Sequence, residues 1–209
     1  MWRNDAGDVV WGTIDTLARP GVLLLLAAGT VLSLLLGPWL GGRIRRSHTA
    51  LTGTFLSLTV ILALTMPVDG RIEAPRMSAE AFWRDLLDPA AYAHYREWGL
   101  GSSEGLANIA LFVPFAFCLA LVTRRFVLTA LAGIALSVAI ETVQSMSYRA
   151  ATVFDVVNNS LGVLIGVALA LVVTLAAIPI HRARRALTGY CGTALSSTTV
   201  NSSCGLSAA

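Results

Sequence analysis

Five long apolar stretches dominate the pattern of hydrophobic and polar positions along this chain. Each is close to the roughly 20 residues that an α-helix needs to cross a hydrocarbon core about 30 Å thick. The pattern therefore predicts an all-α fold, a polytopic membrane helical bundle with about five transmembrane helices. We expect these spans at residues 20–40, 50–68, 105–123, 126–146 and 156–178.

The composition supports a membrane protein and excludes an ordinary soluble domain. Of the 209 residues, 56% are hydrophobic and 13% are charged, whereas soluble domains average about 25% charged residues. The first apolar stretch does not resemble a signal peptide, because acidic residues rather than a basic segment precede it and the run is too long. We therefore expect it to remain in the protein as a span.

The distribution of arginine predicts the orientation, since the sequence contains no lysine. Arginines cluster between spans one and two, between spans three and four, and after span five, at Arg43, Arg45, Arg46, Arg124, Arg125, Arg182, Arg184 and Arg185. The other connections carry the acidic residues. The positive-inside rule then places the N-terminus outside and the C-terminus in the cytoplasm. The net positive charge of +3 fits contact with anionic lipid headgroups and not nucleic acid binding.

These patterns divide the chain into five predicted parts. They are an extracytoplasmic N-terminal segment at 1–19, a two-helix hairpin at 20–68, an extracytoplasmic interfacial loop at 69–103, a three-helix core at 104–180, and a basic then disordered cytoplasmic tail at 181–209. The hairpin is interpreted as scaffold. The loop is either a lid or docking surface for substrate, or an interfacial anchor between spans two and three. The three cysteines predict neither a disulfide framework nor a metal site.

Six polar side chains lie in or beside the last three spans, all towards the predicted outer end. A carboxylate inside hydrocarbon costs about 2.5 to 3.5 kcal/mol even on a lenient insertion scale, so such residues usually have a function. Four recur at helical spacing, two on span four and two on span five. The candidate ligand-binding residues are Asn108, Glu141, Gln144, Arg149, Asp155 and Asn159.

Each of these residues taken alone also has a structural explanation. Asn108 is consistent with an interhelical hydrogen bond, Glu141 with a carboxylate that extends to the lipid interface, and Arg149 with an exposed loop charge. Asp155 is close enough to a helix start to act as a cap. As a set, however, the six residues predict a polar pocket that opens to the outside, formed where spans three, four and five pack together.

The order and spacing of these residues resemble the VanZ-like family of bacterial membrane proteins, over about residues 104–175. One position departs from the family pattern, because Ala116 stands where a glycine is usual. The glycines at 162 and 166 would let a neighbouring helix approach closely. The matching residues are Asn108, Phe112, Pro114 and Phe115 in span three, Ser137, Glu141 and Gln144 in span four, and Arg149, Asp155, Asn159, Gly162 and Gly166 around span five.

The resemblance implies a protein of the bacterial cytoplasmic membrane, since the founding member of the family is associated with teicoplanin resistance. We expect binding or modification of an envelope component: a lipid-linked precursor, a lipid headgroup or a lipoglycopeptide. Enzymatic activity stays open, with Glu141 and Asp155 as the candidate general acid or base. The alternatives are a small structural protein whose polar residues only specify helix packing, or a proton-coupled transporter. No cofactor or metal is expected.

Overall fold

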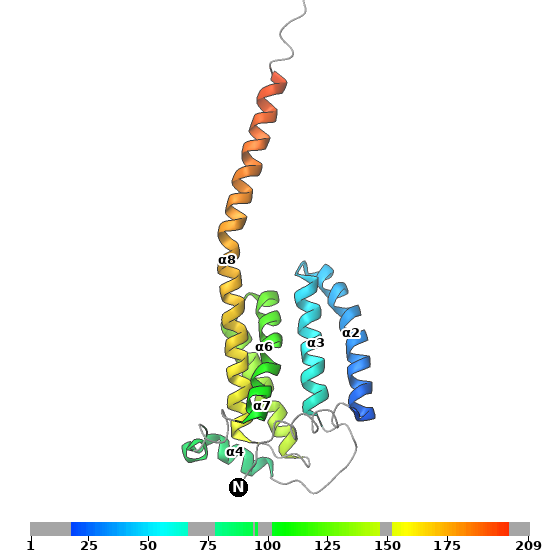
Figure 1. Cartoon of the computed structure of the whole chain (residues 1–209), viewed down its shortest axis with the longest axis vertical. Coiled ribbons are helices and arrows are strands. Elements are labelled where there is room, and N and C mark those ends of the chain that lie inside the picture. Colours follow the sequence, from blue (N-terminus) through cyan, green and yellow to red (C-terminus); the bar gives the residue numbers. More distant parts are fainter. Residues whose placement is uncertain (1–17, 67–77, 94, 96–101, 147–151, 201–209) are drawn as a thin grey trace, which may run out of the picture. The chain divides into compact units, whose positions relative to one another are not determined.

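The computed structural model describes residues 18–66, 78–93, 95, 102–146 and 152–200, with side chains described as far as residue 177. In these residues the chain is helical, which confirms the predicted all-α class. The chain separates into two compact units, Met1–Ala170 and Leu171–Ala209. The helices, labelled in Figure 1, are α2 (Pro20–Ile44), α3 (His48–Thr65), α4 (Ala79–Leu87), α6 (Ser103–Thr123), α7 (Phe126–Ser145) and α8 (Val153–Val200), with a 3-10 helix η1 at Pro89–Tyr92.

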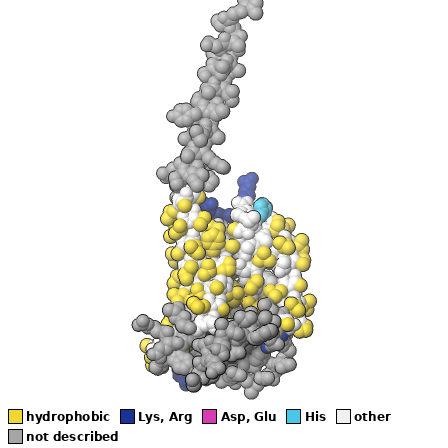
Figure 2. Space-filling model, viewed as in Figure 1, with side chains coloured by type: hydrophobic (Ala, Val, Ile, Leu, Met, Phe, Trp, Pro, Cys, Tyr) yellow, Lys and Arg dark blue, Asp and Glu magenta, His cyan; other side chains and the backbone are white. Residues whose placement is uncertain are grey.

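Five of these helices are long and apolar enough to cross a membrane, and they coincide with the five predicted spans. They are α2, α3, α6, α7 and the first part of α8, Val153–Ala177. Hydrophobic side chains cover the sides of the helices in Figure 2. On α2, for example, Leu24 is 72% exposed and Leu35 is 65% exposed, which suits contact with lipid rather than water.

Helices α2 and α3 form the predicted hairpin, and they pack through small residues. Gly29 of α2 lies against Thr59 of α3, and Gly37 lies against Thr52, so closely that a Cβ at either glycine would overlap the threonine side chain. Ser33, between these glycines, is 2% exposed. Small residues at this spacing allow two helix backbones to approach, which is the usual basis of helix association in lipid.

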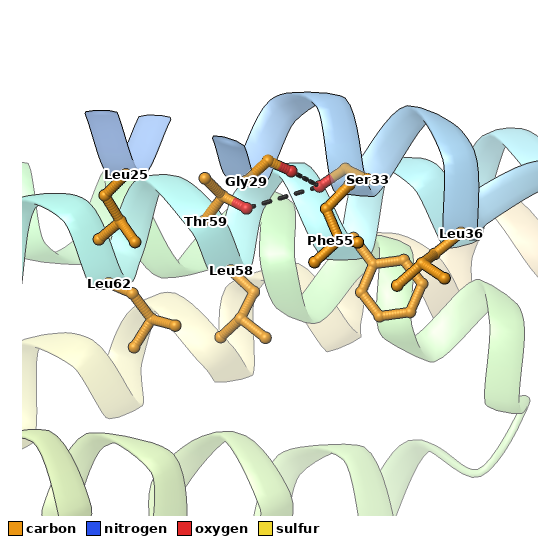
Figure 3. A pocket seen from close by; sticks show the side chains of 9 residues that line it. Leu25, Gly29, Ser33, Leu36, Phe55, Leu58, Thr59 and Leu62 are labelled. Carbon is orange, nitrogen blue, oxygen red and sulfur yellow. Dashed lines mark hydrogen bonds between the residues drawn. The ribbon is translucent and has the colours of Figure 1, made fainter. Parts of the chain in front are cut away.

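An apolar groove of about 230 Å³ lies along this hairpin (Figure 3). The hydroxyl group of Ser33 donates a hydrogen bond to the carbonyl oxygen of Gly29 over 2.6 Å and lies 3.5 Å from the hydroxyl oxygen of Thr59. The polar groups of the groove are thereby satisfied inside the hairpin. Its lining residues are Leu25, Gly29, Leu32, Ser33, Leu36, Phe55, Leu58, Thr59 and Leu62.

The predicted three-helix core is assembled from α6, α7 and the start of α8, with α3 packed against α6. Its apolar centre consists of the buried residues Ile61, Phe112, Phe115, Ala116, Ile140 and Val163. The two glycines of α8 permit the close approach expected of them. A Cβ on Gly162 would overlap the backbone oxygen of Ile109, and one on Gly166 would overlap that of Val113.

Helix α4 packs across α7 at the end of the bundle where α6 and α8 begin, here called the α4 end (Figure 1). Ser78 caps the start of α4, because its hydroxyl accepts from the backbone N–H of Ala81 over 3.1 Å. Asp88 caps the 3-10 helix in the same way. Phe82 is fully buried and contacts Val156. The sequence predicts that this end faces outward.

The last described helix, α8, extends into the predicted cytoplasmic tail at 181–209. The backbone of α8 is helical as far as Val200. No proline follows Pro179 in the sequence, and an existing helix adds each further residue at low cost compared with starting a new one. Residues 201–209 lie outside the described part of the chain.

Candidate functional site

A layer of polar side chains lies at the α4 end, within the predicted spans. It brings together five of the six predicted residues, while Arg149 lies outside the described part of the chain. Glu141 is 3% exposed, Gln144 7% and Asn159 2%, whereas Asn108 and Asp155 are half-buried. We call this the polar layer, defined by Asn108, Ser137, Glu141, Gln144, Asp155, Asn158 and Asn159.

Asp155 connects α8 to α6. Its Oδ1 atom accepts a hydrogen bond from the amide nitrogen of Asn108 over 2.7 Å. Its Oδ2 atom accepts from the hydroxyl group of Thr152 over 2.7 Å, and that hydroxyl oxygen accepts from the backbone N–H of Asp155 over 3.1 Å. The capping oxygen at this helix start therefore comes from Thr152, and the carboxylate holds an interhelical contact.

Gln144 connects α7 to α3. Its amide nitrogen donates to the backbone oxygen of Thr65, 79 residues earlier in the sequence, over 2.8 Å. Thr65 is the last residue of α3, so its carbonyl group has no partner within its own helix. Glu141 lies one turn below Gln144 on α7 and is more deeply buried.

Two further members of the polar layer were not among the predicted ligand-binding residues. Asn158 is 1% exposed, and its Oδ1 atom accepts from the hydroxyl group of Tyr95 over 2.6 Å. Tyr95 thus ties the segment after α4 to α8, and burial raises the pKa of its hydroxyl group above the usual value. Ser137 is fully buried on α7. The only signal for Asn158 in the sequence is the Asn-Asn pair at 158–159.

The register of α7 and α8 places Ser137 and Asn159 at one level. A Cβ on Gly133 of α7 would lie 2.7 Å from Cγ2 of Val163 of α8, and Val138 packs against the contact between Phe82 and Val156. Numbers rise along α7 as they fall along α8, so the helices are antiparallel. One turn from the contact between Gly133 and Val163 therefore brings Ser137 level with Asn159.

Both of these side chains contain a buried polar atom without a hydrogen-bond partner among the described residues. The atoms are the hydroxyl oxygen of Ser137 and Oδ1 of Asn159. Leaving such a group unsatisfied costs about 1–3 kcal/mol, and folded proteins rarely retain one without a reason. One turn further towards the α4 end, the same register places Glu141 level with Asp155.

The polar layer borders the apolar centre of the bundle. Phe112 and Val163 are fully buried and Ile140 is 1% exposed, and the three belong to one apolar cluster. The described part of the chain contains no group of three or more histidine, cysteine, aspartate or glutamate residues that could hold a metal ion. The layer therefore offers carboxylates, amides and a hydroxyl group for hydrogen bonding and proton exchange at one end of the bundle.

This architecture defines a multi-pass membrane protein with a polar layer inside a helical core. A family model described as VanZ/LLP1 matches residues 55–174, so the chain belongs to the VanZ/LLP1 family. The match begins within α3 and includes every residue of the polar layer. No curated protein and no solved structure matches the chain.

Proposed function

We propose that this protein binds or modifies a component of the bacterial cell envelope at its polar layer, from the outer side of the cytoplasmic membrane. The candidate ligands are a lipid-linked precursor, a lipid headgroup, or a lipoglycopeptide such as teicoplanin. Membership of the VanZ/LLP1 family supports an envelope role. The proposal also rests on the predicted orientation, which directs the α4 end outward.

The observation that carries the proposal is the burial of Glu141 within a membrane-spanning helix. The side chain is 3% exposed, although the cost of placing a carboxylate in hydrocarbon opposes this position. A residue needed only to join helices need not be charged, as the amide of Gln144 illustrates by bonding to Thr65. We infer that the carboxylate of Glu141 interacts with the ligand as a hydrogen-bond acceptor or as a proton donor or acceptor.

The other predicted residues divide between support and recognition. Asn108 and Asp155 hold α6 to α8 through their mutual hydrogen bond, and Gln144 holds α7 to α3. These residues position the walls around Glu141 and Asn159. We retain Arg149, whose sequence position lies between Glu141 and Asp155, as a candidate partner for an anionic group of the ligand.

A structural function is the second candidate, and specific contacts favour it. Three side-chain hydrogen bonds of the polar layer join separate segments: Asn108 to Asp155, Gln144 to Thr65, and Tyr95 to Asn158. Such bonds contribute about 0.6 to 2 kcal/mol each to helix association in membranes. If the whole layer served packing, its substitution would reduce the amount of folded protein rather than a specific function.

The test expresses the wild type, Glu141→Gln and a control variant in a glycopeptide-sensitive bacterial host. Teicoplanin and vancomycin susceptibility are measured together with the level of each protein in the membrane. The matched control is Glu104→Gln, the same substitution at an exposed carboxylate in the first turn of α6. We expect the wild type and Glu104→Gln to protect against teicoplanin, and Glu141→Gln to accumulate normally without protecting.

Two results would contradict the proposal. Equal protection by Glu141→Gln at equal membrane level would remove the carboxylate from the function. Loss of the protein from the membrane in Glu141→Gln, but not in Glu104→Gln, would assign Glu141 to packing. An abundant wild type that leaves susceptibility unchanged would separate this chain from teicoplanin and restrict the ligand to the host's own envelope components.

A further inference from the structure

We infer that the level formed by Ser137 and Asn159 is a recognition subsite for a hydrogen-bond-donating group of the ligand, a hydroxyl or an amide N–H. This inference rests on the proposed function and names the chemistry of the group that reaches deepest into the polar layer. A phosphate or another group that only accepts hydrogen bonds does not fit this position.

Ser137 and Asn159 lie on the faces of α7 and α8 that pack against each other. Asn159 lies between Val156 and Val163 on one face of α8. Val163 belongs to the same apolar cluster as Ile140 of α7, and Val156 packs with Phe82 of α4. Ser137 lies one turn from Gly133, which contacts Val163. Both polar side chains therefore face the interface between α7 and α8, next to the turn that carries Glu141.

Two other buried side chains of the same residue types, Ser145 and Asn158, have hydrogen bonds within the protein. Ser145 is as fully buried on α7 as Ser137, yet its hydroxyl group donates to the backbone oxygen of Thr142 over 2.7 Å. Asn158 is buried next to Asn159, yet its Oδ1 atom accepts from Tyr95. The fold thus satisfies the neighbours from within and leaves Ser137 and Asn159 with capacity for another molecule.

The chemistry of the two atoms limits which groups can satisfy them. The Oδ1 atom of Asn159 can only accept a hydrogen bond, and the hydroxyl group of Ser137 can donate or accept. A group that satisfies both atoms must donate to Asn159. Sugar hydroxyls and peptide amides do so, and both occur in glycan precursors and glycopeptides. Phosphate oxygens, when ionised, only accept.

The subsite has a consequence for the stability of the ligand-free protein. A buried polar group without a partner destabilises the ligand-free protein, so replacing it with an apolar group of similar shape should be neutral or stabilising. Ser137→Ala and Asn159→Leu should leave the unfolding midpoint of the purified full-length protein unchanged or raise it. The matched controls Ser145→Ala and Asn158→Leu break existing hydrogen bonds and should lower it.

Binding is tested with two amphiphiles of equal chain length, added to the protein in lipid nanodiscs. Decyl maltoside carries hydroxyl donors, whereas the headgroup of decylphosphocholine carries none. We expect decyl maltoside to raise the unfolding midpoint of the wild type and decylphosphocholine to have no such effect. Ser137→Ala and Asn159→Leu should each weaken the apparent affinity for decyl maltoside by about tenfold, the usual consequence of one lost hydrogen bond.

Specific results would overturn the inference. Lower unfolding midpoints for Ser137→Ala and Asn159→Leu, as large as those of the controls, would show that both side chains serve the fold. Absence of stabilisation by decyl maltoside, or equal stabilisation by both amphiphiles, would refute recognition of a donor. If decyl maltoside binding requires both residues while Glu141→Gln retains full teicoplanin protection, the subsite stands and the proposed function of the carboxylate fails.

Discussion

The amide nitrogen of Gln144 donates a hydrogen bond to the backbone oxygen of Thr65 over 2.8 Å. This contact fixes the end of α3 to α7, although 79 residues separate the two in the sequence. It satisfies a carbonyl group that the geometry of a helix end leaves without an internal partner. The polar layer is therefore joined to the scaffold hairpin as well as to the three-helix core.

Removing this contact should destabilise the protein. In Gln144→Leu the oxygen of Thr65 stays buried without its donor, and we expect a loss of about 1–3 kcal/mol in the free energy of unfolding. The measurement is reversible unfolding in nanodiscs of one lipid composition. Val143→Ala, at a 43% exposed position next to Gln144, is the control and should change stability little. Equal losses in both variants would contradict this account.

The contact between Asn108 and Asp155 should appear as a coupling free energy. We expect Asn108→Ala and Asp155→Ala, measured singly and together, to couple by about 0.6 to 2 kcal/mol, because each removes one partner of the 2.7 Å hydrogen bond between α6 and α8. A double-mutant cycle on unfolding free energies gives this value. Strict additivity would show that the carboxylate gains its stabilisation elsewhere, for example from Thr152 alone.

A methyl group at Gly162 should separate α6 from α8. A Cβ there would overlap the backbone oxygen of Ile109, which has no rotamer to move away. We expect Gly162→Ala to cost about 1–3 kcal/mol, as overpacking in other cores does, and to lower the amount of protein in the membrane. Gly42→Ala is the control, because a Cβ there would have an ordinary contact of 3.6 Å with His48. Normal unfolding of Gly162→Ala would disprove the close approach.

Alkaline pH should weaken the attachment of the segment after α4. Burial raises the pKa of Tyr92 and of Tyr95 above the usual value near 10. Unfolded tyrosine therefore loses its proton at a lower pH than the folded side chain does. The stabilisation is fully present below pH about 10 and is lost as the pH rises through the folded pKa values.

The sequence makes this titration accessible, since the chain contains no lysine that would lose its charge in the same range. Unfolding midpoints between pH 8 and pH about 11 would be compared for the wild type and for Tyr92→Phe with Tyr95→Phe. We expect the double variant to be less stable at pH 8 and to depend less on pH above about 10. An equally steep decline in both proteins would refute the role of these tyrosines.

The spans were predictable because membrane insertion depends on composition and length. The bounds of α6 and α7, Ser103–Thr123 and Phe126–Ser145, fall within two residues of the predicted ones. Glu141 and Asn159 are buried within the bundle, and their part in ligand binding stays a prediction. The hydrogen-bond partners of the polar side chains were harder to predict from the sequence. Gln144 contacts a backbone oxygen, and a backbone oxygen has no signature in the sequence.

Two other features could not be inferred from sequence for physical reasons. The first is the hydrogen bond from Tyr95 to Asn158. An aromatic residue in this segment also suits the membrane interface, so the sequence does not distinguish an interfacial anchor from a hydrogen-bond donor to α8. The second feature is the end of α8, whose helical backbone continues to Val200. An existing helix adds residues at low cost, so composition alone does not locate its end.

The order of the helices along the chain has a consequence for the biogenesis of the protein. The contacts between α2 and α3 join residues near one another in the sequence, so the hairpin can assemble as soon as both helices have left the ribosome. Glu141 on α7 emerges before α8, which supplies Asn158 and Asn159. Until α8 inserts, the carboxylate of Glu141 lies in the membrane without the polar side chains that α8 supplies. We therefore expect slower synthesis through α8 to lower the amount of protein that accumulates in the membrane.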